Sequence, residues 1–267
     1  MKTVKKLKED IASRMKRCWG ECCALFFVSS GIVIAAVFAI YLTMDFLITF
    51  DVISSAGDPV MLAVAAAIAV VMWIITQPYN YGMRWYRLQQ VRGHSVHAKS
   101  VFSCYFSFKR MMQVYRISAV LALKKLVLVV PLAAFLGTSI FLIMKADAVG
   151  GSVLYNVIVV ILLMLSVVMC IAYSMITLKY AAAPYLFALG HDRPVDEIIK
   201  ESVSFMKGKN GYMAEAMSNC AFMLVPCVIV FSMVFVIPRM MMLYTSAINE
   251  IIEEGFKNDR LVGIEQK

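Results

Sequence analysis

The amino-acid sequence predicts an all-α, polytopic transmembrane helical bundle with about five spans and with amphipathic helices at the membrane surface. Of its 267 residues, 61% are hydrophobic and 16% are charged, whereas a soluble domain carries about 25% charged residues. Several apolar stretches reach the ~20 residues that a helix needs to cross the hydrocarbon layer. These stretches are continuous, whereas the strands of a membrane barrel alternate over ~10 residues. We therefore expect helices, which pair their backbone groups internally.

Residues 1–23 are expected to form a basic amphipathic helix. Its apolar residues recur every three or four positions and so share one face: Val4, Leu7, Ile11, Met15, Cys18, Trp19 and Cys22. The lysines and arginines project elsewhere, which suits the headgroup layer of a membrane; a plain solvated leader is the alternative. The apolar run from Ala24 to Met44 is longer than the roughly 7–15 residues of a signal peptide. It therefore predicts an uncleaved first span.

The transmembrane bundle is expected to occupy residues 24–252. Its spans are predicted at about 24–50, 60–76, 117–144, 153–178 and 213–236. Lys124 and Lys125 fall inside the third window, so the hydrocarbon part of that span is expected to start after them. In the alternative count of six spans, Met240–Ile252 also crosses the membrane. Residues 253–267 are interpreted as a polar C-terminal tail.

The distribution of lysine and arginine predicts how the chain is oriented. The segment 1–23 holds seven of them, and the loops 77–125 and 179–210 hold nine and five. The loop 51–59 holds none and 145–152 holds one. Because cytoplasmic loops carry the excess of basic residues, the N-terminus and the two long loops are expected in the cytoplasm. No nucleic-acid-binding pattern accompanies the net charge of +9, so nucleic acid is not an expected partner.

The stretch from Tyr79 to Arg116 mixes cationic and aromatic residues. Amphipathic rings and cations on long apolar stems gather at the interface between membrane and water. With the N-terminal lysines, this stretch predicts a collar that contacts anionic lipid headgroups. Its candidate residues are Lys5, Lys6, Lys8, Trp19, Arg84, Trp85, Arg87 and Arg92. In the alternative interpretation, the same charges only set the topology.

A second amphipathic helix is predicted over Pro194–Lys207. Pro194 suits the first helical position, and Asp196 and Glu197 suit the positive end of the helix dipole. Gly208 is typical of a helix C-terminus. The face expected to pack on the bundle consists of Val195, Ile198, Ile199, Ser202, Val203 and Met206.

No pattern marks an enzyme, and we expect no catalytic residue, no metal and no cofactor. The sequence lacks HExxH, GxSxG and phosphate-binding glycine motifs. His94 and His97 are three positions apart, but two ligands alone make a weak metal site. Asp45 and Glu215 are the acids within the predicted spans, and both lie near span ends. Two such acids are weak evidence for a proton relay. The seven cysteines contain no CxxC pair and are interpreted as small hydrophobic residues.

The segment 180–209 carries a more specific pattern. Its main positions are Tyr180, Tyr185, Pro194, Glu197, Ser202, Met206, Lys207 and Gly208. The pattern resembles the signature of a bacterial integral-membrane family, domain of unknown function 975. That family is similar in turn to the membrane domain attached to some glycerophosphodiester phosphodiesterases. The resemblance implies a multi-pass protein of the bacterial cell membrane and implies no activity, substrate or active site.

Three functional hypotheses follow. The leading one is a non-enzymatic membrane protein that organises lipid or an unknown protein partner at the cytoplasmic face. The alternative is a small transporter or permease-like protein for a lipid-like or amphipathic solute, and a membrane enzyme is the third. A dry core with a basic aromatic collar would favour the first hypothesis. A polar cavity or broken helices at the midplane of the membrane would favour the second hypothesis. Clustered acids or histidines in an open pocket would favour the third.

Overall fold

The computed structural model describes residues 3–49, 59–145, 153–190, 193–224 and 230–265, and over these residues it contains helices and no strand. The all-α prediction is therefore confirmed. In chain order the elements are α1 (Val4–Thr49), α2 (Pro59–Val91), the 3₁₀-helix η1 (Ala98–Phe106), α3 (Phe108–Lys145), α4 (Val153–Leu178), α5 (Ala183–Leu189), α6 (Val195–Met206), α7 (Asn210–Leu224) and α8 (Val230–Glu265).

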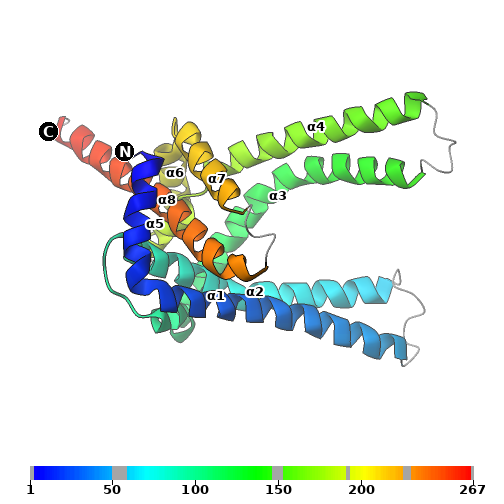
Figure 1. Ribbon diagram of the computed structural model, residues 1–267, viewed down its shortest axis with the longest axis horizontal. Helices are drawn as coiled ribbons and strands as arrows, with labels where there is room; N and C mark the ends of the chain where they lie inside the picture. Colours follow the sequence, from blue (N-terminus) through cyan, green and yellow to red (C-terminus); the bar gives the residue numbers. More distant parts are fainter. Residues whose placement is uncertain (1–2, 50–58, 146–152, 191–192, 225–229, 266–267) are drawn as a thin grey trace.

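Two long helical hairpins project to the same side of a more compact body (Figure 1). The first arm pairs α1 after Leu25 with α2 before Pro78, and the second arm pairs α3 after Leu121 with α4. The rest of α1, α2 and α3 forms the body together with η1 and α5 to α8. Both ends of the described chain lie on the body, away from the tips of the arms (Figure 1). The base of each arm is therefore the place where apolar helices meet the charged body.

The N-terminal part of α1 is amphipathic, as predicted. Its apolar stripe is buried and continues one turn beyond the predicted helix, through Val4, Leu7, Ile11, Met15, Cys18, Cys22 and Leu25. The stripe lies in the protein core, and α1 packs against α8. It is therefore covered by protein and does not rest on lipid headgroups. The predicted helix 1–23 and the predicted first span are one continuous helix.

Apolar residues are exposed on the arms, whereas in the body they are mostly buried. Phe27 is 61% exposed, Ile34 is 67% exposed and Met164 is 68% exposed. Two stretches, Val4–Thr43 and Val157–Leu189, are long and apolar enough to cross a membrane, and 6% of each tested window is buried. The core helix of a soluble protein is mostly buried instead, and soluble monomers rarely expose large apolar patches. The described part of the chain therefore carries two candidate membrane-spanning helices.

The region expected as the loop 77–125 is mostly helical. α2 continues through Pro78 to Val91, η1 follows, and α3 begins at Phe108. A proline inside a helix removes one backbone hydrogen bond, but the turns after Pro78 bury Tyr81, Tyr86 and Leu88 against the body. Packing therefore carries α2 through the proline, and the stretch from Tyr79 to Arg116 is built mainly from helices.

The expected fifth span, 213–236, is wrong as a single crossing. Its residues are divided between α7 and α8, which pack against each other. The segment Met240–Ile252, the sixth crossing of the alternative count, belongs to the core of the body. There it buries the polar residues Thr245, Ser246 and Asn249 as well as apolar ones. The expected polar tail continues α8 as a helix to Glu265.

The predicted helix 194–207 is observed over Val195–Met206, with Pro194 as its N-cap. Asp196 and Glu197 occupy its first turn, as predicted. The predicted face is buried at Val195, Ile198, Ile199, Ser202 and Met206. Val203 was wrongly placed on this face, because it is 37% exposed, and Phe205 is buried in its stead.

Candidate functional site

A cavity of about 370 Å³ lies where α1, α2, α5 and α8 meet, at the base of the first arm. Its polar lining consists of Ser29, Tyr79, Asn80, Arg84, Tyr86, Arg87, Tyr185 and Tyr244. Its apolar lining consists of Cys22, Leu25, Phe26, Met83, Ile237, Pro238, Met241 and Met242. We call it the arginine cavity, and it joins guanidinium and phenol groups with an apolar wall.

The helix α2 places the arginines in this cavity by its periodicity. Lining residues recur on α2 at 79 and 80, at 83 and 84, and at 86 and 87, a spacing of three to four that keeps them on one face. Because α2 runs from the first arm into the body, Tyr79 lies nearer the arm and Arg87 nearer the body interior. The lining from α1 begins at Cys22 in the body and ends at Ser29 in the arm. The cavity therefore straddles the boundary between charged body and apolar arm.

The electrostatic environment of the cavity is positive. The Arg84 guanidinium lies over the ring of Tyr81, 5.1 Å from its centroid, an attractive cation–π arrangement. Burial lowers the pKa of Arg87, yet a guanidinium keeps its charge in proteins. Among the residues that the structure describes, no carboxylate lines the arginine cavity.

The tyrosine hydroxyls tie the walls of the cavity together. The Tyr79 hydroxyl donates to the carbonyl of Leu25 over 2.9 Å and also lies 2.9 Å from Ser29 Oγ. On the opposite wall, the Tyr185 hydroxyl lies 3.2 Å from Thr245 Oγ1. Burial raises the pKa of Tyr79 and of Tyr244, so both phenols are neutral near pH 7. The walls are thus held by neutral hydrogen bonds, and the charge comes from the arginines.

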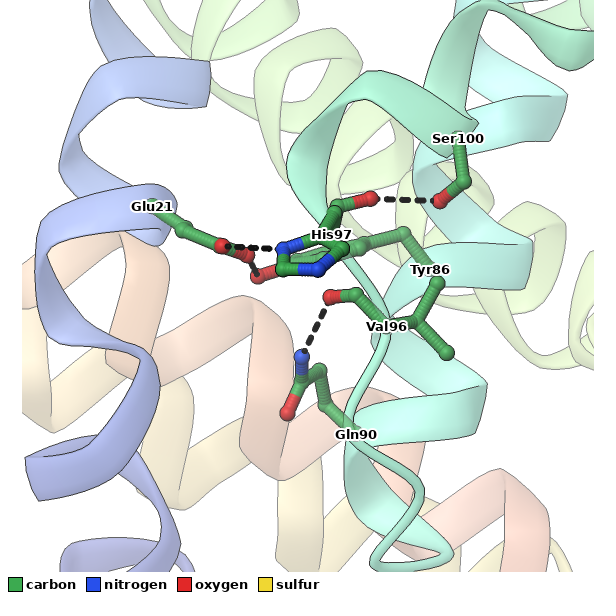
Figure 2. A network of polar contacts seen from close by, with 6 residues as sticks. All are labelled: Glu21, Tyr86, Gln90, Val96, His97 and Ser100. Atoms are coloured by element: carbon green, nitrogen blue, oxygen red, sulfur yellow. Dashed lines mark hydrogen bonds and ion pairs between the residues drawn. The ribbon is translucent and has the colours of Figure 1, made fainter.

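Behind this wall a polar network fixes the chain between α2 and η1 (Figure 2). The Tyr86 hydroxyl donates to Glu21 Oε2 over 2.8 Å, and Glu21 Oε1 lies 3.7 Å from His97 Nδ1. Gln90 donates to the carbonyl of Val96 over 3.1 Å. Burial and the hydrogen bond to Glu21 raise the pKa of Tyr86. The network therefore orients Tyr86, and it connects the cavity to a surface carboxylate that does not itself line it.

The predicted collar does not form a single surface. Arg84 and Arg87 line the cavity, whereas Trp85 lines a smaller pocket on η1 with Ser100, Ser103 and Arg110. Arg92 donates from Nε to Asn249 Oδ1 of α8 over 2.9 Å.

The N-terminal members of the collar are also separated. Lys5 and Lys6 are exposed on α1. Lys8 donates to the Asn219 side chain on α7, and Trp19 stacks on Phe235 of α8 with ring centroids 5.3 Å apart. Of the eight candidate residues, the structure brings two, Arg84 and Arg87, together in this cavity.

The residues of the 180–209 pattern mainly build the fold. Tyr185 alone among them lines the cavity. Ser202 is buried and donates to the carbonyl of Lys179 over 2.9 Å, which attaches α6 to the end of α4. Glu197 is exposed beside Arg193 at 3.4 Å, and Gly208 has a positive φ of 74°. The remaining positions are divided between surface and core: Pro194 and Lys207 are exposed, Tyr180 is half-buried and Met206 is buried.

Sequence reasoning missed the part of the lining that comes from α1 and α8. Ser29, Ile237, Met241 and Tyr244 all face the cavity. The three-to-four spacing on α2 was a signal for Tyr79 and Met83, which share a face with the arginines. The residues of α8 reach the cavity because α8 packs against helices that are distant in the sequence, and no local sequence pattern identifies them.

The other polar candidates are dispersed. No group of three histidine, cysteine or acidic side chains with metal-binding geometry occurs among the described residues. Asp45 and Glu215 are exposed on α1 and α7. Among the cysteines, Cys18, Cys22, Cys104 and Cys220 are buried thiols, and Cys227 lies outside the described part of the chain. Their burial fits the interpretation as small hydrophobic residues.

Fold and site together define a class: an all-helical protein with membrane-length apolar arms and a cationic cavity at the base of one arm. No family model, no curated protein and no solved structure matches this chain. The resemblance of residues 180–209 to domain of unknown function 975 stays a prediction.

Proposed function

We propose that this chain is a non-enzymatic, multi-pass membrane protein that binds the anionic headgroup of a membrane lipid in the arginine cavity and so organises lipid at the cytoplasmic face. One observation carries the proposal. Arg84 and Arg87 line a cavity that also has an apolar wall, and no described carboxylate lines it. Such a lining suits a ligand that is both anionic and apolar.

The placement in the membrane rests on the arms. α4 has 26 residues, which at 1.5 Å per residue gives ~39 Å, more than the ~30 Å hydrocarbon layer. α2 and α3 run antiparallel to α1 and α4 in the two hairpins (Figure 1), so four crossings follow if both arms enter the bilayer. Phe106 and Phe108 are 88% and 73% exposed, and they follow Tyr105, whose hydroxyl donates to the carbonyl of Ile75 at the base of the first arm. Aromatic residues are enriched at this level of a membrane protein.

The orientation rests on charge. Among the described residues, the body carries most of the basic residues of the segments 1–23, 77–125 and 179–210, whereas 51–59 and 145–152 hold one basic residue in total. The positive-inside rule then places the body in the cytoplasm. The arginine cavity would lie at the level of the inner headgroups, where the leaflet is anionic.

The choice of an anionic ligand rests on Arg84 and Arg87, because no described carboxylate lines the cavity beside them. Removing a charge from water costs free energy unless a partner offsets the loss. A lipid phosphate is a suitable partner, because guanidinium groups bind phosphate oxygens through two parallel hydrogen bonds. The neighbouring apolar wall, formed by Phe26, Ile237 and Met241, fits the upper part of the acyl chains.

The test is lipid retention by the purified protein. The double variant Arg84→Gln/Arg87→Gln removes two charges from the cavity, and Lys5→Gln/Lys6→Gln removes two charges from the exposed part of α1. Native mass spectrometry after purification from mixed bilayers is expected to show loss of bound anionic lipid in the cavity variant and retention in the N-terminal variant.

Equal retention by both variants, with unchanged membrane orientation, would refute binding in the cavity. In that case the collar charges only set the topology, and the hypotheses of a protein partner or a transported solute would gain support.

A further inference from the structure

We infer that the arginine cavity selects a small phosphomonoester headgroup, as in phosphatidic acid, over a phosphodiester headgroup. The inference rests on the proposed lipid-binding function and specifies the class of lipid. It is drawn from the balance of charge, the supply of hydrogen-bond donors and the size of the cavity.

The charge balance favours a dianion. Arg84 and Arg87 contribute two positive charges, and no carboxylate of the described residues lines the cavity. Glu21 does not line the cavity, and its carboxylate accepts a hydrogen bond from the hydroxyl of Tyr86, which does. A phosphomonoester carries about −1.5 to −2 near pH 7, whereas a phosphodiester carries a single negative charge. The monoester therefore balances both guanidiniums, and the diester leaves one of them unbalanced.

The donors favour a phosphate with three terminal oxygens. The hydroxyls of Tyr79 and Tyr86 already donate to the Leu25 carbonyl and to Glu21. The guanidiniums of Arg84 and Arg87, each with five N–H donors, are the charged donors among the lining residues. Residues three apart on a helix have Cβ atoms about 5–6 Å from each other, so the two guanidiniums can bind one phosphate from two sides. A third terminal oxygen gives the second guanidinium a full partner.

The size of the cavity favours a headgroup without a further substituent. Its volume of about 370 Å³ is near the lower end of the ~300–1,000 Å³ of small-molecule sites. Tyr79 and Tyr185 close its sides through hydrogen bonds to neighbouring helices. A phosphate on the lipid's glycerol fits this space, and the acyl chains would pass Phe26 and Ile237 toward the arm.

The experiment compares lipids that differ only in the headgroup. Full-length protein is reconstituted in neutral phosphatidylcholine nanodiscs that contain a minor fraction of phosphatidic acid or of phosphatidylglycerol with the same acyl chains. Retained lipid is counted by native mass spectrometry at pH 7.5 and constant ionic strength. One additional charge-assisted hydrogen bond corresponds to roughly a tenfold preference or more, so retention of phosphatidic acid is expected to exceed that of phosphatidylglycerol by about this factor.

Matched variants assign the preference to the cavity. Arg84→Gln should reduce the ratio of phosphatidic acid to phosphatidylglycerol toward one, and Lys5→Gln/Lys6→Gln should leave it unchanged. Equal retention of both lipids that still depends on Arg84 would overturn the selectivity and leave the proposed function in place. Retention that depends on neither arginine would overturn both.

A competition experiment with soluble compounds distinguishes a lipid from a free phosphate compound. Glycerol 3-phosphate and inorganic phosphate are added as competitors at increasing concentration. A lipid site predicts that neither displaces phosphatidic acid, because both lack the chains that contact the apolar wall. Full displacement by glycerol 3-phosphate would identify a soluble phosphomonoester as the ligand and would overturn the assignment to a lipid.

Discussion

At Gly82, α2 approaches η1 closely enough to leave no room for a side chain. A Cβ atom built at this position would lie 1.9 Å from the carbonyl oxygen of Val101, far inside the contact distance of two heavy atoms. Because the obstacle is backbone, rotation of a side chain cannot relieve it. Gly82 lies between Tyr79 and Arg84, so the same close packing that seats η1 also holds the part of α2 that lines the arginine cavity.

We expect Gly82→Ala to destabilise the protein by about 1–3 kcal/mol, the usual cost of overpacking. The measurement is the thermal unfolding of purified protein in detergent, followed by scanning fluorimetry. The matched control is Gly20→Ala in α1, where an added Cβ has no neighbour within 4 Å. Alanine favours the helix interior there by about 0.5–1 kcal/mol. If Gly82→Ala were as stable as Gly20→Ala, the close contact with Val101 would be wrong.

Individual arginines show what the sequence can and cannot predict at this scale. Arg84, Arg87 and Arg92 were all predicted to contact lipid, but Arg92 donates to Asn249, 157 positions away. Charge and local aromatic neighbours identify a cation near a membrane interface. They do not identify its partner, because that partner is set by how α8 packs on α2.

Among the elements, α6 has the clearest division between buried and exposed residues. Ile198 is fully buried in the main core cluster, and Glu201 on the same helix lies 2.8 Å from Arg193. Ser202 attaches the helix to the end of α4. The helix therefore covers the body on its apolar side and is held in position by polar contacts on its flanks.

Two substitutions on α6 separate the observed face from the predicted one. Ile198→Ala should cost about 2–5 kcal/mol, because it opens a cavity in the core. Val203→Ala should change the free energy of unfolding by no more than about 0.5 kcal/mol, because Val203 is 37% exposed. Chemical denaturation of the two variants in the same detergent gives both values. Comparable losses would place Val203 on the buried face, as the sequence alone predicted.

Periodicity predicted α1 and α6 well, because their apolar residues repeat every three or four positions. It failed for the fifth span, where hydropathy alone cannot distinguish one long apolar helix from two shorter helices that cover each other. Met213 and Ala216 of α7 are fully buried in the same cluster as Leu243 and Ala247 of α8. The apolar residues that suggested a membrane crossing are therefore shared between two helices of the body.

At the scale of the whole molecule, the chain has two different surfaces. The arms present apolar side chains, and the body presents the basic segments and carries the cavity at the base of the first arm. The all-helical class followed from the sequence because long apolar runs leave few alternatives. The arrangement as two hairpins and a body did not, because it depends on contacts between helices distant in the sequence.

The orientation gives the prediction for the whole molecule. Single cysteines at Ser95, in the body, and at Thr49, at the end of α1 in the first arm, are placed in a background without the native thiols. With the body in the cytoplasm, a membrane-impermeant maleimide added to intact cells should label Thr49→Cys and leave Ser95→Cys unlabelled. Permeabilised cells provide the control, since both positions should then react. Labelling of Ser95→Cys alone in intact cells would show that the orientation is the opposite of the predicted one.

The contact between Lys8 of α1 and Asn219 of α7 joins residues 211 positions apart. During synthesis at about 5–20 residues per second, α1 is made roughly 10–40 s before that partner exists. Its apolar stripe from Val4 to Leu25 therefore emerges from the ribosome before α7 and α8, and in this interval the headgroup layer is the surface that suits a basic amphipathic helix. Both arms are complete before the body can close, so a chain that ends ahead of α7 would leave this stripe uncovered and recognisable to chaperones and proteases.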